Sequence, residues 1–303
     1  MKRRKTDGSW SPNERGIYFL ALWDTDMPSK LATLPYQKNI SALIEYGLLE
    51  HNPPAAECAI NLAKSYRHLM IDSGVFSLAN SEAKRKGVSF EEGLRLKLAD
   101  IDTGEKYLAD YMAMCQQIKK DVWGYVEVDL GGREEKIKTR ERFHAAGLCP
   151  IPVYHPLLDG TDYLDYLCDG YDRICVSNLV QSSSETRAIL TAFVYDRIMR
   201  RPENKRPFVH FLGVSPGQAH FPHNCLGSCD SSTWAMGRRF GVEKTMAFSQ
   251  VVPFVSSDGN HRYAPVQGGV DGYQNSQRFQ MMNWGMHGYE DYYEEVHRSH
   301  MAV

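Results

Sequence analysis

The chain has 303 residues, of which 43% are hydrophobic and 24% charged, and its formal net charge is −2. These values are typical of a globular protein with a large buried core, and they exclude a disordered or fibrous chain. A charge this close to zero also argues against a protein that binds nucleic acid through a uniformly basic surface.

No apolar run approaches the roughly 20 residues needed to cross a bilayer. The basic N-terminus is followed by polar residues and not by the apolar stretch of a signal peptide. The seven cysteines are an odd number, spread thinly along the chain, which indicates free thiols. We therefore expect a soluble protein with no membrane partner. It would stay in the cytoplasm.

Short apolar segments alternate with longer amphipathic segments along the chain. The short segments predict strands at Ile17–Leu22, His68–Asp72, Trp123–Asp129, Ile151–His155, Arg173–Ser177, Phe208–Val214 and Leu226–Asp230, with an eighth near Thr245–Val251. The longer segments predict helices over Asn39–Leu49, Arg133–Ala146, Ser184–Arg200 and Tyr289–His300.

Strands that alternate with helices indicate parallel βαβ units. About eight such units in a chain of this length predict an α/β fold, a closed (β/α)8 TIM-like barrel. We find no linker or repeat, so residues 1–303 are expected to form a single domain, with 242–303 as a C-terminal extension. A doubly wound open sheet remains an alternative, because spacing alone does not separate the two folds.

Four polar residues stand where predicted strands end, namely Asp72, Asp129, His155 and Asp230. The chemistry of (β/α)8 barrels is carried out at the carboxyl ends of the strands. One such aspartate could be a helix N-cap. Four polar residues at the same end of the strands predict a site.

The segment Asp72-Ser73-Gly74-Val-Phe76 is the most informative of these strand ends. Gly74 permits a tight turn close to a ligand, and Phe76 could stack on a flat ring. The alternative is an Asx-turn after the strand, with Phe76 in the core. Asp230 could likewise be a nucleophile in glycosyl transfer, or an N-cap for a helix over Thr233–Phe240.

The order of these motifs resembles the transglycosylase superfamily, which includes the tRNA-guanine transglycosylases. The resemblance runs from Leu69 to about Phe240, and includes Asp-Ser-Gly-x-Phe, a Val-Asp strand end, a His-x-x-Gly-Val strand and Asp-Ser-Ser. The closer resemblance is to the DNA-acting branch of phages and bacterial genomic islands, which installs 7-deazaguanines in DNA.

The resemblance implies a role for each matching position. Asp230 would be the nucleophile, Asp72 the general acid/base, and Asp129 the residue that recognises the base. His155 stands where the tRNA enzymes use a Gln to read the base. The full set of implied substrate-binding residues is Asp129, Ser73, Gly74, Phe76, His155, Val176, Ser177, Asn178 and Gly213.

The implied reaction replaces guanine in DNA by a preformed 7-deazaguanine base, such as 7-cyano-7-deazaguanine. Two displacements at C1′ through a covalent aspartyl-glycosyl intermediate would retain the configuration, as in a retaining glycosidase. No cofactor is needed, because one glycosidic bond is exchanged for another. The expected partners are DNA, the deazaguanine base and helper proteins that open the duplex. Candidate phosphate contacts come from basic stretches that contain Arg197, Arg200, Arg201, Arg238 and Arg239.

Three other functions stay open at this stage. They are a tRNA-guanine transglycosylase, a nucleoside or base hydrolase on the same scaffold, and a non-catalytic subunit that binds nucleic acid. The chain lacks the Cys-x-Cys-x-x-Cys zinc motif of the tRNA enzymes and their extra RNA-binding domain, which favours DNA. Zinc is only weakly indicated, by His220, His223, Cys225 and Cys229, whose residue types suit the metal but whose spacing matches no standard pattern.

Overall fold

In the computed structural model, part of the chain is described in detail. This part comprises residues 3–14, 17–22, 25, 41–50, 54–89, 92–93, 96, 101–177, 179, 184–214, 227–232, 254–255 and 261–262. The predicted segments Thr245–Val251, Tyr289–His300 and Thr233–Phe240 lie outside these residues.

Eight parallel strands form one sheet, in the order β4-β3-β2-β1-β8-β7-β6-β5. The strands are β1 (Ile17–Ala21), β2 (Ser41–Glu45), β3 (His68–Asp72), β4 (Gly124–Tyr125), β5 (Val153–Tyr154), β6 (Arg173–Val176), β7 (Phe208–Phe211) and β8 (Gly227–Ser231). Two short strands outside this sheet, β9 (Phe254–Val255) and β10 (His261–Arg262), pair with each other.

The sheet is closed into a barrel. β1 pairs in parallel with β8. At the other seam, a parallel bridge joins Val126 to Ile151. The amide of Glu127 donates to the carbonyl of Ile151 at 3.0 Å, and the amide of Ile151 donates to that of Tyr125 at 2.9 Å. The predicted (β/α)8 barrel is therefore confirmed, and the open-sheet alternative is wrong.

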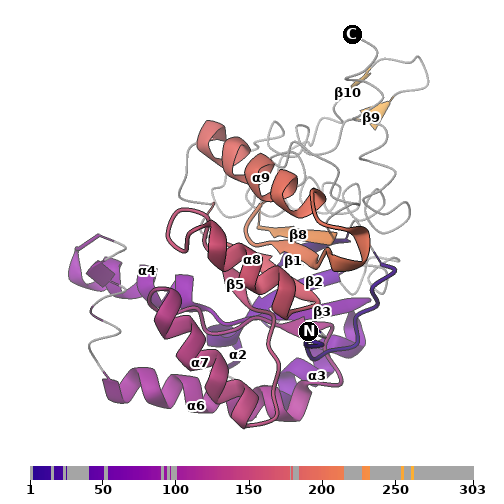
Figure 1. The fold of residues 1–303 in the computed structure, drawn as a ribbon. Coiled ribbons are helices and arrows are strands. Elements are labelled where there is room, and N and C mark those ends of the chain that lie inside the picture. The colour runs from indigo at the N-terminus through magenta and orange to yellow at the C-terminus, as the bar shows by residue number, and fades with distance from the viewer. Residues whose placement is uncertain are drawn as a thin grey trace.

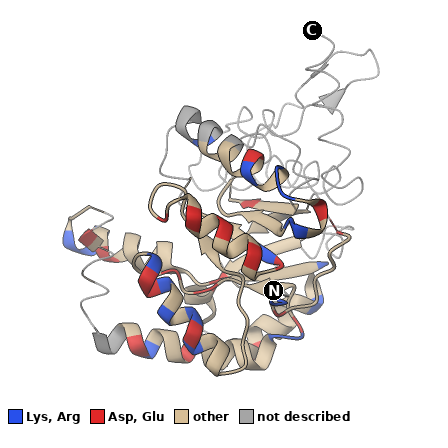
Figure 2. Cartoon of the chain, viewed as in Figure 1, with Lys and Arg blue, Asp and Glu red and all other residues tan. Residues whose placement is uncertain are grey.

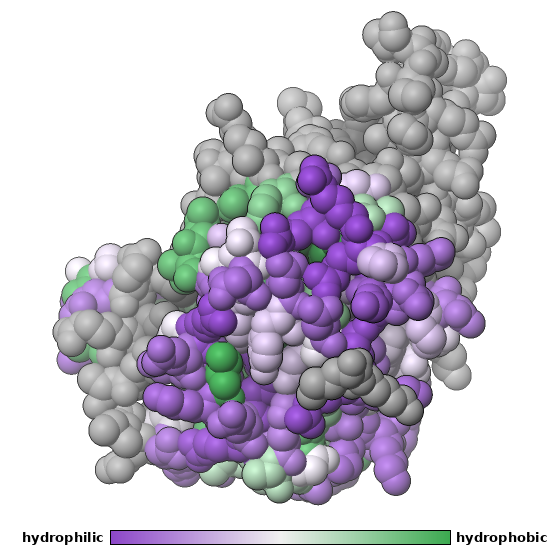
Figure 3. Space-filling view, viewed as in Figure 1, coloured by the Kyte–Doolittle hydropathy of each residue, from purple (hydrophilic) through white to green (hydrophobic). Residues whose placement is uncertain are grey.

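Helices surround the barrel (Figure 1). They are α2 (Tyr46–Glu50), α3 (Ala55–Ser65), α4 (Val75–Lys86), α6 (Ile101–Ile118), α7 (Arg133–Ala145), α8 (Thr161–Gly170), α9 (Ser184–Met199) and the 3-10 helix η2 (Glu203–Lys205). The described part of the face seen in Figure 3 is predominantly hydrophilic, as expected for an outer ring of helices. Among the described helices, none combines the length and the apolar character of a membrane span.

The helix predicted over Asn39–Leu49 is the main error at the level of elements. Residues Ser41–Glu45 form strand β2, and α2 begins only at Tyr46. Ala42, Leu43 and Ile44 are all buried, since a barrel strand is covered on both faces. Such a strand has a continuous apolar run, which here also fits a helical period. β2 is therefore one of the eight strands of the barrel, and the barrel does not need the eighth strand predicted near Thr245–Val251.

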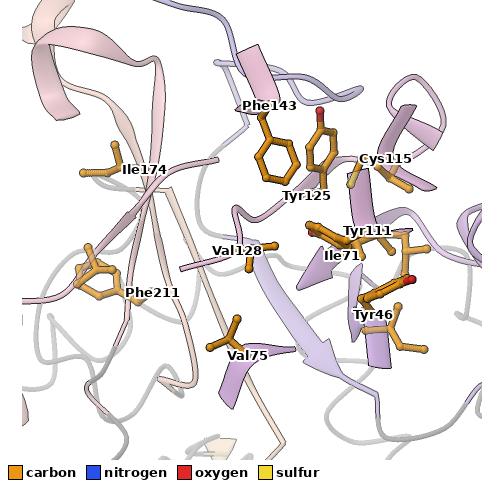
Figure 4. Close-up of a cluster of buried hydrophobic side chains, with 14 of the residues drawn as sticks. Tyr46, Ile71, Val75, Tyr111, Cys115, Tyr125, Val128, Phe143, Ile174 and Phe211 are labelled. Carbon is orange, nitrogen blue, oxygen red and sulfur yellow. The ribbon is translucent and has the colours of Figure 1, made fainter. Parts of the chain in front are cut away.

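Two apolar cores hold the barrel together. An inner cluster lies inside the barrel and includes the side chains of Phe19, Met70 and Phe208. A larger outer cluster lies between the strands and the helices. Figure 4 shows part of the outer cluster, in which Tyr111 of α6 lies near Ile71 of β3. Because alternate strand residues face opposite ways, one strand can contribute to both clusters, as β3 does with Met70 in the inner cluster and Leu69 and Ile71 in the outer one.

The amino ends of the strands are covered by residues 3–14. Backbone amides of Arg4, Asp7 and Ser9 donate to carbonyls just before three successive strands, at Gly170, Cys149 and Val122. Trp10 continues this segment and packs edge-on against Phe208, with 5.6 Å between ring centroids. The chain therefore closes its own barrel at the end opposite to the predicted site.

Arg173 of β6 lies at the centre of this closure. Its guanidinium lies over the rings of Trp10 and Trp123, at 4.6 and 4.8 Å from their centroids. It donates to the carbonyl of Trp123 at 2.9 Å, and also to the carbonyl of Asp7. Burial lowers the pKa of Arg173 to about 9, although the negative charge of Asp172 acts to raise it. A buried cation with this many partners is costly to remove.

We expect Arg173→Met to lower the free energy of unfolding by about 3–5 kcal/mol, because it leaves buried carbonyls without a donor. Urea denaturation followed by circular dichroism measures the loss. Arg142→Met is the matched control. Arg142 pairs with Glu105 on the surface, where such a pair is worth about 1 kcal/mol or less. Equal losses in the two variants would contradict the role assigned to Arg173.

Candidate active site

The carboxyl ends of the strands bring a group of acidic side chains into the mouth of the barrel. Asp72 ends β3 and faces inward like Met70, two residues before it. The charges of Asp129, Glu45 and Asp230 all raise the pKa of Asp72, so these carboxyl groups lie near one another. The structure therefore brings together the three aspartates that the sequence predicted, and adds a fourth acid.

Asp72 is the most perturbed of these acids. Burial is the largest cause and the three neighbouring carboxylates add to it, which raises the pKa to about 8. Its one hydrogen bond among the described residues is a long one, from the amide of Gly74 to Oδ2 at 3.4 Å. A carboxyl group with this pKa is largely protonated at neutral pH, so it can donate a proton.

The turn after Asp72 is built on Gly74. Its φ of +77° lies in the left-handed region, which favours glycine. A Cβ there would come within 3.1 Å of the Tyr107 hydroxyl, which itself donates to the carbonyl of Ser73. Phe76 follows on the first turn of α4 with 47% of its surface exposed, so it does not lie in the core. The other part of that alternative, an Asx-turn, agrees with the contact from the Gly74 amide to the Asp72 carboxylate.

Asp230 of β8 is held by one of its two oxygens. Oδ1 accepts a hydrogen bond from the amide of Gly213 at 2.9 Å and lies 3.1 Å from Nε2 of His210. On the other side of that imidazole, Nδ1 lies 2.8 Å from the hydroxyl of Ser228. Among the described contacts, Oδ2 of Asp230 takes part in none. One oxygen is thus anchored, while the other makes no hydrogen bond with the described residues.

Asp129 pairs with His155, whose Nε2 lies 2.9 Å from Oδ2. Burial alone would raise the pKa of Asp129. The hydrogen bond and charge of His155, with the charge of Lys136, outweigh burial and lower it. Behind the pair, the buried carboxylate of Asp159 accepts the amide of His155 at 2.7 Å and pairs with Lys136. Asp129 therefore stays ionised, on a support with little freedom to move.

Sequence reasoning missed two residues of this site. Glu45, at the end of β2, accepts a hydrogen bond from the Ser77 hydroxyl, and burial raises its pKa. It was missed because its segment was interpreted as a helix. His210 belonged to a noted motif, but its contact with Asp230 depends on how β7 and β8 pair, which places His210 opposite Ser228.

The remaining predicted binding residues differ in their positions. The side chain of Val176 is fully buried in the outer core, so it does not line the mouth. The amide of Ser177 donates to the carbonyl of Tyr154 at 3.0 Å. Gly213 is at the site, with a φ of +69° and its amide on Asp230. Asn178 lies outside the described residues.

The described arginines of the basic stretch are not at the mouth. Arg197 and Arg201 pair with Asp165 of α8, and Arg201 also pairs with Asp169. Figure 2 shows the acidic positions along α8. Arg200 pairs with Asp196 within its own segment. Arg197 lies in the last turn of α9, and Arg200 and Arg201 follow its carboxyl end, beside the amino ends of the strands. Arg238 and Arg239 lie outside the described residues.

The zinc candidates are only partly described. Cys229 is buried in the outer core, as a packed cysteine is, and burial raises the pKa of its thiol well above the usual value. His220, His223 and Cys225 lie outside the described residues. Within the described ranges, no group of three or more His, Cys, Asp or Glu residues is arranged to hold a metal ion.

No protein-family model and no curated protein matches the sequence. Among solved structures, the chain is similar to a tryptophan synthase from M. tuberculosis, at 13% identity and a TM-score of 0.40, over 75% of this chain and 87% of that one. It is also similar to a protein from Aquifex aeolicus VF5, at 14% identity and a TM-score of 0.35, over 89% and 98% of the two chains. Likenesses this distant carry no information on substrate or reaction.

The raised pKa of Asp72 predicts a stability effect with a definite sign. Between about pH 4 and pH 8 the folded protein binds this proton more tightly than the unfolded chain does, so the carboxyl group lowers stability as pH rises. Asp72→Asn cannot ionise. We expect it to be more stable than wild type by about 1–3 kcal/mol at pH 8, with the difference vanishing near pH 4.

Urea titrations at a series of pH values measure this difference. Asp129→Asn is the matched variant of opposite sign. It gives up the pair with His155, and should be less stable than wild type at neutral pH. A constant difference between Asp72→Asn and wild type from pH 4 to pH 8 would show that Asp72 does not hold its proton.

Proposed function

We propose that this protein exchanges a base on nucleic acid, replacing guanine in DNA by a preformed 7-deazaguanine. One observation carries the proposal. Two carboxyl groups with unlike environments share the mouth of a (β/α)8 barrel. Asp72 is crowded by other acids and keeps its proton, while Asp230 has one oxygen anchored and the other without a hydrogen bond among the described residues. Unlike environments of this kind are what separates an acid from a nucleophile.

In the first displacement, Oδ2 of Asp230 bonds to C1′ of the target nucleotide as the bond from C1′ to N9 of guanine breaks. Guanine is a poor leaving group as an anion, so Asp72 transfers its proton to the departing base. The products are neutral guanine, a glycosyl ester on Asp230 and an ionised Asp72.

In the second displacement, Asp72 takes the proton from N9 of the incoming deazaguanine. That nitrogen attacks C1′, and the electron pair of the ester bond returns to the carboxylate of Asp230. Two inversions retain the configuration at C1′. Atoms and charge balance over the cycle, and both carboxyl groups return to their starting states.

Asp129 is suited to recognising the base, because N1–H and the 2-amino group of guanine are both donors and a carboxylate is an acceptor. Its pair with His155 keeps it ionised and oriented. The target nucleotide must leave the stack to reach the mouth. We assign stacking on the base to the ring of Phe76, which is 47% exposed and lies four residues after Asp72. Arg197, Arg200 and Arg201 have no part in this proposal.

The test uses duplex DNA with radiolabelled guanine, 7-cyano-7-deazaguanine and the full chain. We expect release of labelled guanine together with appearance of the deaza-deoxynucleoside by mass spectrometry. Asp230→Ala and Asp72→Asn should each lower the rate by about 10³-fold or more. Asp165→Asn, which removes a carboxylate outside the mouth, should not.

Other outcomes lead to different conclusions. Guanine release without incorporation would favour a hydrolase, in which water attacks the ester. In a parallel assay with tRNA that carries radiolabelled guanine, release of guanine from tRNA but not from DNA would keep the chemistry and change the substrate. Wild-type activity in Asp230→Ala would refute the covalent route.

A further inference from the structure

The two oxygens of Asp230 have unequal surroundings, and one imidazole is responsible for much of the difference. β7 and β8 pair so that His210 lies directly opposite Ser228, with Asp230 two residues further along the same inward face. His210 is 1% exposed, and it bridges the Ser228 hydroxyl and Oδ1 of Asp230. The ring of Phe19 packs edge-on against it at 5.6 Å, which limits its rotation.

Hydrogen-bond counting favours one arrangement of protons in this chain. A neutral imidazole has one N–H donor and one acceptor nitrogen, a hydroxyl has one donor, and a carboxylate has none. If Nε2–H donates to Asp230, then Nδ1 accepts from Ser228. Every group is then satisfied without a buried positive charge. The amide of Gly213 supplies the second donor to the same oxygen of Asp230.

We propose that His210 is a positioning residue for Asp230: as the neutral Nε2–H tautomer set by Ser228, it fixes Oδ1 so that Oδ2 is the oxygen that attacks. This inference rests on the proposed function for its kinetic part. Its structural part, the tautomer and the anchored oxygen, does not.

The anchored oxygen has a different task in each displacement. In the glycosyl ester, Oδ2 is bonded to C1′ and Oδ1 becomes the carbonyl oxygen. When the ester breaks, negative charge returns to the carboxylate, and donors on Oδ1 stabilise that charge as it develops. In the first displacement charge is lost instead, so the same donors mainly orient the nucleophile. Loss of His210 should therefore slow breakdown of the ester more than its formation.

The kinetic experiment compares His210→Leu, His210→Gln and Ser228→Ala in the full chain. His210→Leu removes the donor, and should lower kcat about 10–100-fold with little change in the KM for the deazaguanine. His210→Gln places an amide N–H near the position of Nε2, and should stay within about tenfold of wild type. His144→Gln, on the outer helix α7, is the control and should be unaffected.

A second readout separates positioning from a general structural role. In the presence of the deazaguanine, His210→Leu should accumulate the covalent DNA–protein adduct, seen by denaturing electrophoresis and mass spectrometry. A variant that is merely misfolded in part would lower adduct and turnover together. Wild-type kcat in His210→Leu, or an unchanged ratio of adduct to turnover, would overturn the positioning role.

The structural part is tested without any substrate. ¹⁵N NMR of histidine-labelled protein reports which ring nitrogen of His210 carries the proton. We expect the Nε2–H tautomer in wild type, and a mixture of tautomers in Ser228→Ala. An Nδ1–H ring in wild type would overturn the inference whatever the activity. If the tautomer is as expected but no variant and no wild-type protein exchanges bases, the proposed function fails and the anchoring of Asp230 stands.

Discussion

Repulsion among carboxylates is the constraint that organises the mouth of this barrel. Four acids share one partly buried space, and in such a space they cannot all ionise cheaply. Asp129 has an imidazole and a nearby lysine, Asp230 has a backbone amide and an imidazole nitrogen on one oxygen, and Glu45 has a serine hydroxyl. Asp72 has only a long contact with a backbone amide. The acid with the weakest partners is therefore the one that keeps its proton.

Packing at the other end of the barrel offsets the loss of stability that the acids of the mouth cause. The N-terminal segment and Arg173 close the amino ends of the strands. Inside the barrel, the inner cluster of aromatic and aliphatic side chains packs next to this closure. The destabilising acids are thus confined to the last residues of the strands. A site that costs stability persists where the surrounding scaffold is rigid and well packed. The buried pair of Lys136 and Asp159 extends that rigidity to the loop that carries His155.

Much of this site could be predicted from the sequence, because the position of a residue at the end of a parallel strand fixes which face of the barrel it joins. That reasoning located Asp72, Asp129 and Asp230. It failed for Glu45, since a strand buried on both faces has no alternating pattern. It also failed for His210, whose role depends on the pairing of two strands. Arg197 resembled a phosphate contact until the fold placed Asp165 beside it.

In the proposed reaction, Asp230 is the nucleophile of the first displacement and the leaving group of the second. Its hydrogen-bond donors must therefore stabilise its negative charge neither too strongly nor too weakly. A cation against Asp230 would stabilise the carboxylate strongly, and the first displacement would have to overcome that stabilisation. With no donor, the carboxylate would be free to rotate, and the second displacement would expel an unassisted anion. Two N–H donors on Oδ1, one from a backbone amide and one from an imidazole, lie between these limits. The proposed reaction therefore places the nucleophile at Asp230, and not at Asp72, which keeps its proton, or at Asp129, which has the charge of Lys136 beside it.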